Sequence, residues 1–308
     1  MAQKSGWETR NWNSIYRNER EFMRYLTACY TDKGKRKDVN QDSLLVSRGR
    51  LDGEEAVLAV ICDGMGGLSS GELASAEAVH SLAGWFREEM EELAKQEDFE
   101  DELYGSWERL LKQVHEKIRS YGQLHDRKMG TTVTAMLFWK ENYYIVHIGD
   151  SRIYEIKERA VQITKDQTLA ELMKAEEKTR KEAPKSEHVL LQALGASKVV
   201  KPAYYSGSTK NGAAYLLCTD GFRHKIRNEE LLEIFAPGEM TDEAVMRARG
   251  EETARRVLDR GERDNISVIL VRTVQEEDCG EVPEVCEDKK GYALEGETVL
   301  AHTERIMQ

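Results

Sequence analysis

An apolar run that ends in an aspartate and a glycine-rich loop constrains this chain more than any other stretch. Residues 57–62 (VLAVIC) have the length and composition of a buried strand, and Asp63 follows directly. Three glycines occupy positions 64, 66 and 67. Because glycine lets the backbone approach a ligand closely, an acidic group beside such a loop is typical of a metal or phosphate site.

Similar aspartates recur along the chain. Asp150 and Asp220 also end apolar strand patterns next to a glycine, Asp42 precedes a strand pattern, and Asp264 lies in a turn that enters one. A single Asp-Gly pair is more often a turn than a ligand. Several carboxylates in one cleft repel one another unless cations neutralise them, and Mg²⁺ and Mn²⁺ prefer oxygen ligands. Together with Asp63, the set predicts a site for hard divalent cations.

The charge balance limits the classes of partner. The 308 residues carry a formal net charge of −11, whereas a general nucleic-acid or anionic-membrane binder would be basic. No run reaches the about 18 apolar residues of a membrane span. The five cysteines are odd in number and no secretion signal is visible, so we expect a cytoplasmic protein with reduced thiols.

The order of the patterns indicates the fold class. Strand patterns follow one another in hairpin order, two long helical patterns stand in one block, and more helix follows later, which favours an α+β fold over alternating βαβ units. We expect a polar arm over residues 1–21, a body over 22–273, and an acidic, flexible tail over 274–308. Within the body, residues 165–183 form a charged helical pattern and 199–206 a strand pattern.

Six short motifs carry a resemblance to a known family. In chain order they are 40–42 (NQD), 62–67 (CDGMGG), 129–132 (MGTT), 149–152 (GDSR), 217–222 (LCTDGF) and 263–267 (RDNIS). Each is weak alone, but six in order are specific. They resemble the metal-dependent (type 2C) serine/threonine protein phosphatases of the bacterial branch, over about residues 22–273. The resemblance implies a β-sandwich of two antiparallel sheets flanked by helix pairs, in four layers.

The resemblance also implies roles for the matching residues. Asp63 would bridge two catalytic metals, and Gly64 would add a backbone carbonyl. Asp220 and Asp264 would complete the first metal site, and Asp42 would hold a metal-bound water or a metal directly. We therefore expect two Mn²⁺ or Mg²⁺ ions as cofactors.

Two further positions complete the implied site. Asp150 matches a position that helps to bind a third, looser metal, and Asn265 would orient the cluster. A water or hydroxide between the metals would attack the phosphorus of phosphoserine or phosphothreonine directly. No phosphoenzyme intermediate is implied.

The sequence departs from the family pattern at three places. The arginine that usually binds substrate phosphate is replaced by Lys37, with Arg36 beside it. Lysine binds phosphate as a point charge and lacks the bidentate fork of arginine. Gln41 stands where glutamate is common, which lowers the negative charge near the second metal. Met65 stands where eukaryotic members have a histidine proposed as general acid.

The resemblance also bears on partners. Residues 164–195 match the family's flap region, and we expect this region to contact substrate proteins. Expected partners are phosphorylated proteins made by a serine/threonine kinase, with no nucleic acid or membrane, and the protein is expected to be a monomer. Two alternatives stay open: a non-catalytic scaffold of the same fold, and a phosphoesterase for small molecules. The retention of Asp63, Asp220 and Asp264 favours the enzyme.

Overall fold

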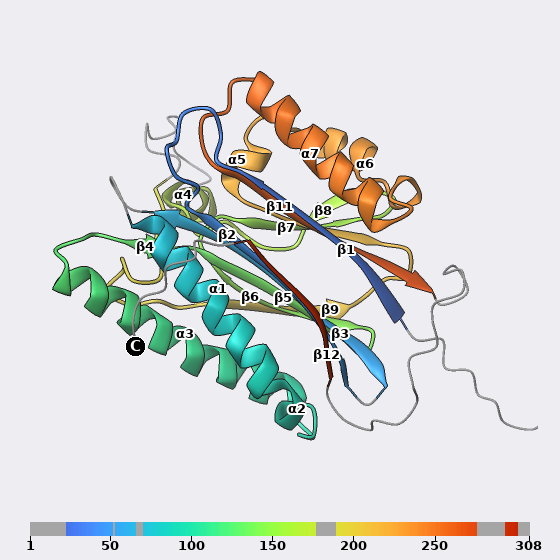
Figure 1. Cartoon of the computed structure of the whole chain (residues 1–308), viewed down its shortest axis with the longest axis horizontal. Coiled ribbons are helices and arrows are strands. Elements are labelled where there is room, and N and C mark those ends of the chain that lie inside the picture. The colour runs from blue at the N-terminus through green and yellow to red at the C-terminus, as the bar shows by residue number, and fades with distance from the viewer. Residues whose placement is uncertain (1–22, 52, 66–69, 177–188, 276–292, 301–308) are drawn as a thin grey trace, which may run out of the picture.

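Two antiparallel sheets, packed face to face, form the centre of the protein (Figure 1). The computed structural model describes residues 23–51, 53–65, 70–176, 189–275 and 293–300. The five-stranded sheet has the order β1 (Met23–Asp32), β11 (Ile266–Gln275), β10 (Ala214–Cys218), β7 (Arg152–Ile156) and β8 (Ala160–Gln162). The other sheet has the order β12 (Ala293–Leu300), β2 (Asp42–Leu51), β3 (Glu54–Met65), β5 (Val133–Trp139), β6 (Asn142–Ile148) and β9 (Ala203–Ser208), with β4 (Gly130–Thr131) paired to the end of β3.

Helices cover the outer faces of both sheets. Against the sheet that contains β3 lie α1 (Gly71–Glu88), α2 (Met90–Leu93) and α3 (Phe99–Leu124). On the opposite side of the molecule lie α5 (Asp220–Arg223), α6 (Asn228–Ile234), a 3₁₀ turn (Pro237–Glu239) and α7 (Glu243–Asp259). The short α4 (Leu169–Glu176) belongs to the segment between β8 and β9. The predicted four-layer α+β sandwich is therefore confirmed.

Strand β3 shows why this arrangement follows from the sequence. Successive side chains of a strand point to opposite faces, so Val57, Ala59 and Ile61 enter the core between the two sheets. Leu58 and Val60 enter the core beneath α1 and α3. Because both faces of β3 are buried, its sequence is a continuous apolar run instead of an alternating one, and the strand leads Asp63 out of the core at a fixed place.

Some boundaries differ from those expected. Residues 293–300 form β12, which pairs with β2 along the sheet edge, whereas the acidic composition predicted a flexible tail there. The expected helix over 165–183 is limited to α4 among the described residues, and 177–188 lie outside them. The strand expected over 199–206 begins only at Ala203, where pairing with β6 starts. Pairing with distant strands sets these limits, and local composition does not record it.

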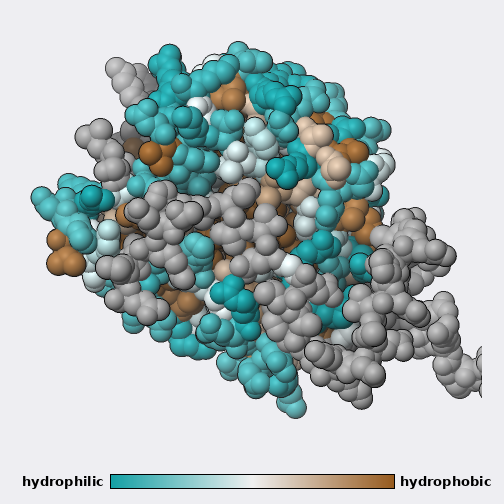
Figure 2. Space-filling model, in the orientation of Figure 1, coloured by the Kyte–Doolittle hydropathy of each residue, from teal (hydrophilic) through white to brown (hydrophobic). Residues whose placement is uncertain are grey.

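The described surface is mostly polar. Figure 2 shows hydrophilic side chains over most of the coloured surface in this view, with small, separate hydrophobic patches. None of the described helices is long and apolar enough to cross a membrane.

Candidate active site

Asp63 is held at the end of β3 through its backbone. Its N–H donates to Thr132 Oγ1 (2.9 Å), and its carbonyl accepts from Thr132 N–H (2.9 Å) and from Thr131 Oγ1 (3.0 Å). Both threonines are fully buried. Asp42, the first residue of β2, is the cross-strand partner of Asp63. Directly opposed residues in an antiparallel pair have Cα atoms about 4.5–5.5 Å apart, so two acidic residues lie side by side.

Asp42 is nearly inaccessible to solvent, with 4% exposed. Its Oδ2 accepts hydrogen bonds from Ser267 Oγ (2.6 Å) and Thr219 Oγ1 (3.1 Å). These two hydroxyls come from β11 and the end of β10, in the five-stranded sheet, whereas Asp42 belongs to β2 in the other sheet. The contact brings the ends of both sheets to one place.

Asp220 and Asp264 come from the five-stranded sheet. Asp220 begins α5 directly after β10, and Asp264 lies in the turn before β11. A Cβ at Gly221 would lie 2.1 Å from the carbonyl oxygen of Asn265, and a Cβ at Gly34 would lie 2.5 Å from that of Asp264. Gly34 also has a positive φ of 76°. Only glycine at these two positions lets the three segments approach so closely.

Asn265 ties the acidic turn to the loop before β2. Its Oδ1 accepts from Gln41 N–H (3.0 Å), and its Nδ2 donates to the carbonyl of Lys33 (2.9 Å). Gly64 N–H in turn donates to the carbonyl of Gln41 (3.1 Å). The loops that carry Asp264, Asp42 and Asp63 are therefore joined by one chain of hydrogen bonds.

Lys37 reaches the same cluster. Its Nζ lies 2.8 Å from Asp264 Oδ1. Partial burial lowers the pKa of Lys37, but the hydrogen bond to Asp264 and the charges of Asp264, Asp63 and Asp220 raise it overall. The neighbouring Arg36 is exposed. Of the two predicted phosphate-binding cations, the structure brings Lys37 to the carboxylates.

Asp150 lies at the other side of the cluster, after β6. Arg223 Nη2 is 3.8 Å from Asp150 Oδ2 and 3.4 Å from Asp166 Oδ2. Arg152 also binds Asp166, through two hydrogen bonds of 2.7 Å. The Asp150 side chain is only 6% exposed, so Arg223 supplies part of the charge that a buried carboxylate requires.

The pKa values show how closely these groups interact. Burial, followed by the charges of Asp42, Asp220, Asp150 and Asp264, raises the pKa of Asp63 well above its usual range. Burial and the charge of Asp220 raise the pKa of Asp42 and of Asp150 to about 7 each, against the hydroxyl hydrogen bonds of Asp42 and the Arg223 charge at Asp150. A charged group shifts the pKa of another group in this way only when the two lie close together. The structure therefore gathers all five predicted aspartates.

The donor chemistry of the cluster fits hard divalent cations. Asp42 Oδ1 and Asp220 Oδ1 are buried without a hydrogen-bond partner, and carboxylate oxygens are the ligands that Mg²⁺ and Mn²⁺ prefer. Among the residues that the structure describes, no group of three or more His, Cys, Asp or Glu side chains is arranged to hold a metal ion as it stands. The ligand types match such an ion.

Comparison with known proteins agrees with this site. The family model described as protein phosphatase 2C matches residues 31–261. The chain belongs to the protein phosphatase 2C family. Among its relatives, protein phosphatase PhpP of Streptococcus pneumoniae is 31% identical over 257 residues, which cover 80% of this chain and 97% of that protein.

Solved structures of this family share the fold. The phosphatase PstP/Ppp of Mycobacterium tuberculosis has a TM-score of 0.64 at 27% identity, over 81% of this chain and 98% of that one. The catalytic domain of PstP in complex with two manganese ions has a TM-score of 0.62 at 28% identity, over 82% and 98% of the two chains. The predicted family and enzyme class are confirmed, and this protein phosphatase 2C is a hydrolase of a metal-dependent family.

Sequence reasoning missed two kinds of residue in this phosphatase. Arg223 and His224 bring positive or polar nitrogen atoms to the acidic cluster, with His224 Nε2 3.5 Å from Asp220 Oδ2. Their position within one helical turn of Asp220 was an available signal. The hydroxyl groups of Thr219 and Ser267 are the other kind. Only the three-dimensional approach of β10 and β11 to Asp42 reveals their role.

Proposed function

We propose that this protein phosphatase 2C hydrolyses phosphoserine and phosphothreonine in proteins, with Asp63 as the shared ligand of two divalent cations. The convergence of Asp42, Asp150, Asp220 and Asp264 on Asp63 carries the proposal. Asp42 is the cross-strand partner of Asp63, and burial together with the charges of the four carboxylates raises the pKa of Asp63. When bound, two such cations supply an activated water and positive charge for the phosphoryl oxygens. The side chains of the chain itself provide the remaining functions.

The carboxylates hold and orient the reacting centre. Asp63 and the backbone carbonyl of Gly64 would hold the cations from β3. Asp220 and Asp264 would complete the first metal position, and Asp42 would hold a metal or its water at the second. Hydrogen bonds join the segments that carry Asp42, Asp63 and Asp264, which favours a fixed geometry. We propose that Asn265 and Gln41 keep the three loops in register through the hydrogen bonds described above.

Lys37 is the proposed phosphate-binding cation. Its ammonium group is within hydrogen-bond distance of Asp264 and can donate to a phosphoryl oxygen while it keeps this contact, because it carries three N–H donors. Arg36 is exposed beside it and extends the positive charge of this loop. Met65 offers no proton at the end of β3, so the leaving alkoxide of the substrate must take its proton from another donor.

The finer assignments belong to the same proposal. We infer that Mn²⁺ or Mg²⁺ is the resident metal, with Asp150 near a third position. We also infer that the substrates are proteins phosphorylated by a serine/threonine kinase in the cytoplasm, and that the enzyme acts as a monomer without binding nucleic acid.

One assay tests the catalytic assignment. Phosphate release from a phosphothreonine peptide is measured with Mn²⁺, with EDTA, and for Asp63→Asn, and metal-dependent release should be lost in the last two. The matched control is Asp259→Asn, because Asp259 is an exposed aspartate that pairs with Lys35 and is not one of the five clustered aspartates. Equal release by wild type and Asp63→Asn would refute the assignment. Release from nucleotides but not from peptides would favour a small-molecule phosphoesterase.

A further inference from the structure

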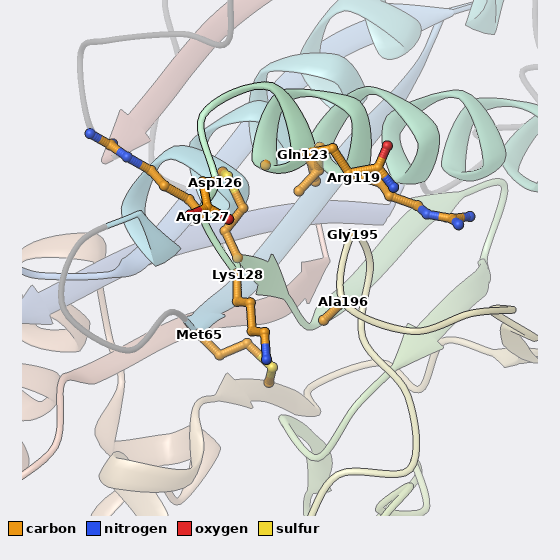
Figure 3. Close-up of a pocket in the computed structure, with 11 residues that line it drawn as sticks. Met65, Arg119, Gln123, Asp126, Arg127, Lys128, Gly195 and Ala196 are labelled. Carbon is orange, nitrogen blue, oxygen red and sulfur yellow. The ribbon is translucent and has the colours of Figure 1, made fainter.

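A cavity of about 670 Å³ opens beside the end of β3. It is lined by Met65, by the last turns of α3, by residues 126–129, and by Gly195 and Ala196. Figure 3 shows the Lys128 side chain extending toward Met65, with Arg119 and Arg127 on opposite sides of the cavity. None of these side chains is used in the catalytic assignment above.

Positive charge dominates the cavity lining. It contains three cations, Arg119, Arg127 and Lys128, and one carboxylate, Asp126. Arg127 Nη1 donates to Ser70 Oγ (3.2 Å), which anchors it beside the start of α1. Lys128 is exposed, and among the described residues no carboxylate lies within ion-pair distance of its ammonium group. A local positive site on a chain of net charge −11 is suited to an anionic ligand.

The cavity is joined to the catalytic cluster through the backbone. Met65 stands two residues after Asp63 on β3, and two residues of a strand span about 7 Å. Met65 pairs with Gly130, which follows the cavity residue Met129. A Cβ at Gly130 would lie 2.7 Å from the carbonyl oxygen of Leu194, so the segment that leads to Gly195 packs directly on this strand end. The cavity and Asp63 therefore keep a fixed separation.

We propose that this cavity binds an acidic side chain of the phosphoprotein substrate, two to four residues from the phosphorylated residue. The inference rests on the proposed function and adds a substrate class to it. An extended peptide advances about 3.3 Å per residue, so a residue at that spacing lies about 7–13 Å from the phosphorylated position. The two strand residues from Asp63 to Met65, about 7 Å, fall at the near end of this range. Lys128 makes the direct ion pair, Arg119 and Arg127 add long-range attraction, and Met65 packs against the aliphatic part of the side chain.

The test compares three phosphothreonine peptides that differ only two to four positions from the phosphorylated residue, where they carry Asp, Ala or Lys. The wild type should prefer the Asp peptide over the Ala peptide by about twofold to fivefold for each exposed pair, through KM more than kcat. Lys128→Glu should reverse the preference, and Lys128→Met should abolish it. The preference should also weaken in 0.5 M salt, because exposed charges are screened.

Two controls separate this inference from the proposed function. Lys112 lies on α3 and does not line the cavity. Lys112→Glu makes the same change of charge as Lys128→Glu, and this variant should keep the preference for the Asp peptide. Hydrolysis of p-nitrophenyl phosphate, which is too small to reach the cavity from the cluster, should stay unchanged in all variants. If wild type does not distinguish the peptides, or if both Lys128 variants keep the wild-type preference, the inference is wrong while metal-dependent hydrolysis stands. If Lys128→Glu does not fold, Lys128→Met decides the result.

Discussion

The hydrogen bonds that hold the backbone of Asp63 make Thr132→Val an informative change. Valine keeps the shape of threonine but removes the hydroxyl that accepts from Asp63 N–H at 2.9 Å. Thr132 is fully buried. The Asp63 N–H would lose its protein acceptor, and the buried Ser151 Oγ, 3.3 Å from Thr132 Oγ1, would lose a partner as well. The side chain of Asp63 would then sit on a less restrained strand end.

The expected cost of the change is estimated from the Asp63 N–H, which loses its acceptor. A buried polar group left without its partner costs about 1–3 kcal/mol. In a body of this size, 1 kcal/mol shifts the midpoint of thermal unfolding by about 2–4 °C, so we expect a decrease of about 2–12 °C. Metal-dependent phosphate release should fall further than stability alone explains, because the proposed shared ligand is displaced, and the Mn²⁺ concentration at half-maximal activity should rise.

Thr132→Ser is the matched control. Serine keeps the hydroxyl and loses one methyl group, which costs about 0.8 kcal/mol or somewhat more in a buried site. Its unfolding midpoint should also fall, but its Mn²⁺ dependence should remain that of wild type. The reasoning fails if the valine variant keeps wild-type Mn²⁺ dependence, or if the serine variant loses it to the same degree.

Three other predictions concern charge and pairing. In metal-free protein, Asp42 and Asp150 have pKa values of about 7 when folded and near 4 when unfolded. The folded state therefore binds more protons between these pH values, and the free energy of unfolding should fall as the pH rises from 4 through 7. Urea unfolding in EDTA at pH 5 and pH 8 measures this difference. Lys37→Met removes the ion pair with Asp264 and the proposed contact with the substrate phosphate. It should raise KM for phosphopeptides by about tenfold to a hundredfold, since a hydrogen bond to a charged group is worth about 1.5–3 kcal/mol. A chain that ends at residue 292 lacks β12 and should unfold at lower temperature and associate more readily, because the edge of β2 becomes unpaired.

Each of these has a contrary outcome. A metal-free protein that is more stable at pH 8 than at pH 5 would contradict the raised pKa values, and Asp42→Asn should flatten the dependence. Lys37→Arg should restore KM, so an arginine variant as poor as Lys37→Met would argue against a charge role. Unchanged unfolding and association of the chain without β12 would mean that the pairing with β2 adds nothing to stability.

The sequence predicted what depends on local pattern. The apolar run that ends at Asp63 identified a strand buried on both faces, and the repetition of strand-end aspartates identified the members of the acidic cluster. Both are properties of short segments, because strand length, burial and the glycine that follows are all recorded within about ten residues. The motif order then gave the family, and the family gave the sandwich.

What the sequence could not show depends on distant pairing. The acidic tail has no composition typical of a core strand, and only the free edge of β2 explains why residues 293–300 pair there. The cavity beside Met65 combines the end of α3 with Gly195 and Lys128, which share no motif. The approach of Arg223 to Asp150 is likewise set by how α5 packs. To predict such arrangements, the strand register and the packing of whole helices and strands must be known.

The distribution of counter-charges distinguishes Asp63 from its neighbours. Lys37 pairs with Asp264, Arg223 approaches Asp150, and His224 lies near Asp220. Within the described ranges, Asp42 has no cation beside it but accepts hydrogen bonds from two hydroxyl groups. Among the described residues, the Asp63 carboxylate has neither a cation within ion-pair distance nor a hydrogen-bond donor. Its pKa is raised well above the usual range by burial and by the other carboxylates. A cation placed beside Asp63 therefore relieves both the desolvation of this group and the repulsion from all its neighbours. This electrostatic demand, which the strand-end motif alone does not contain, is the physical reason to propose Asp63 as the shared ligand.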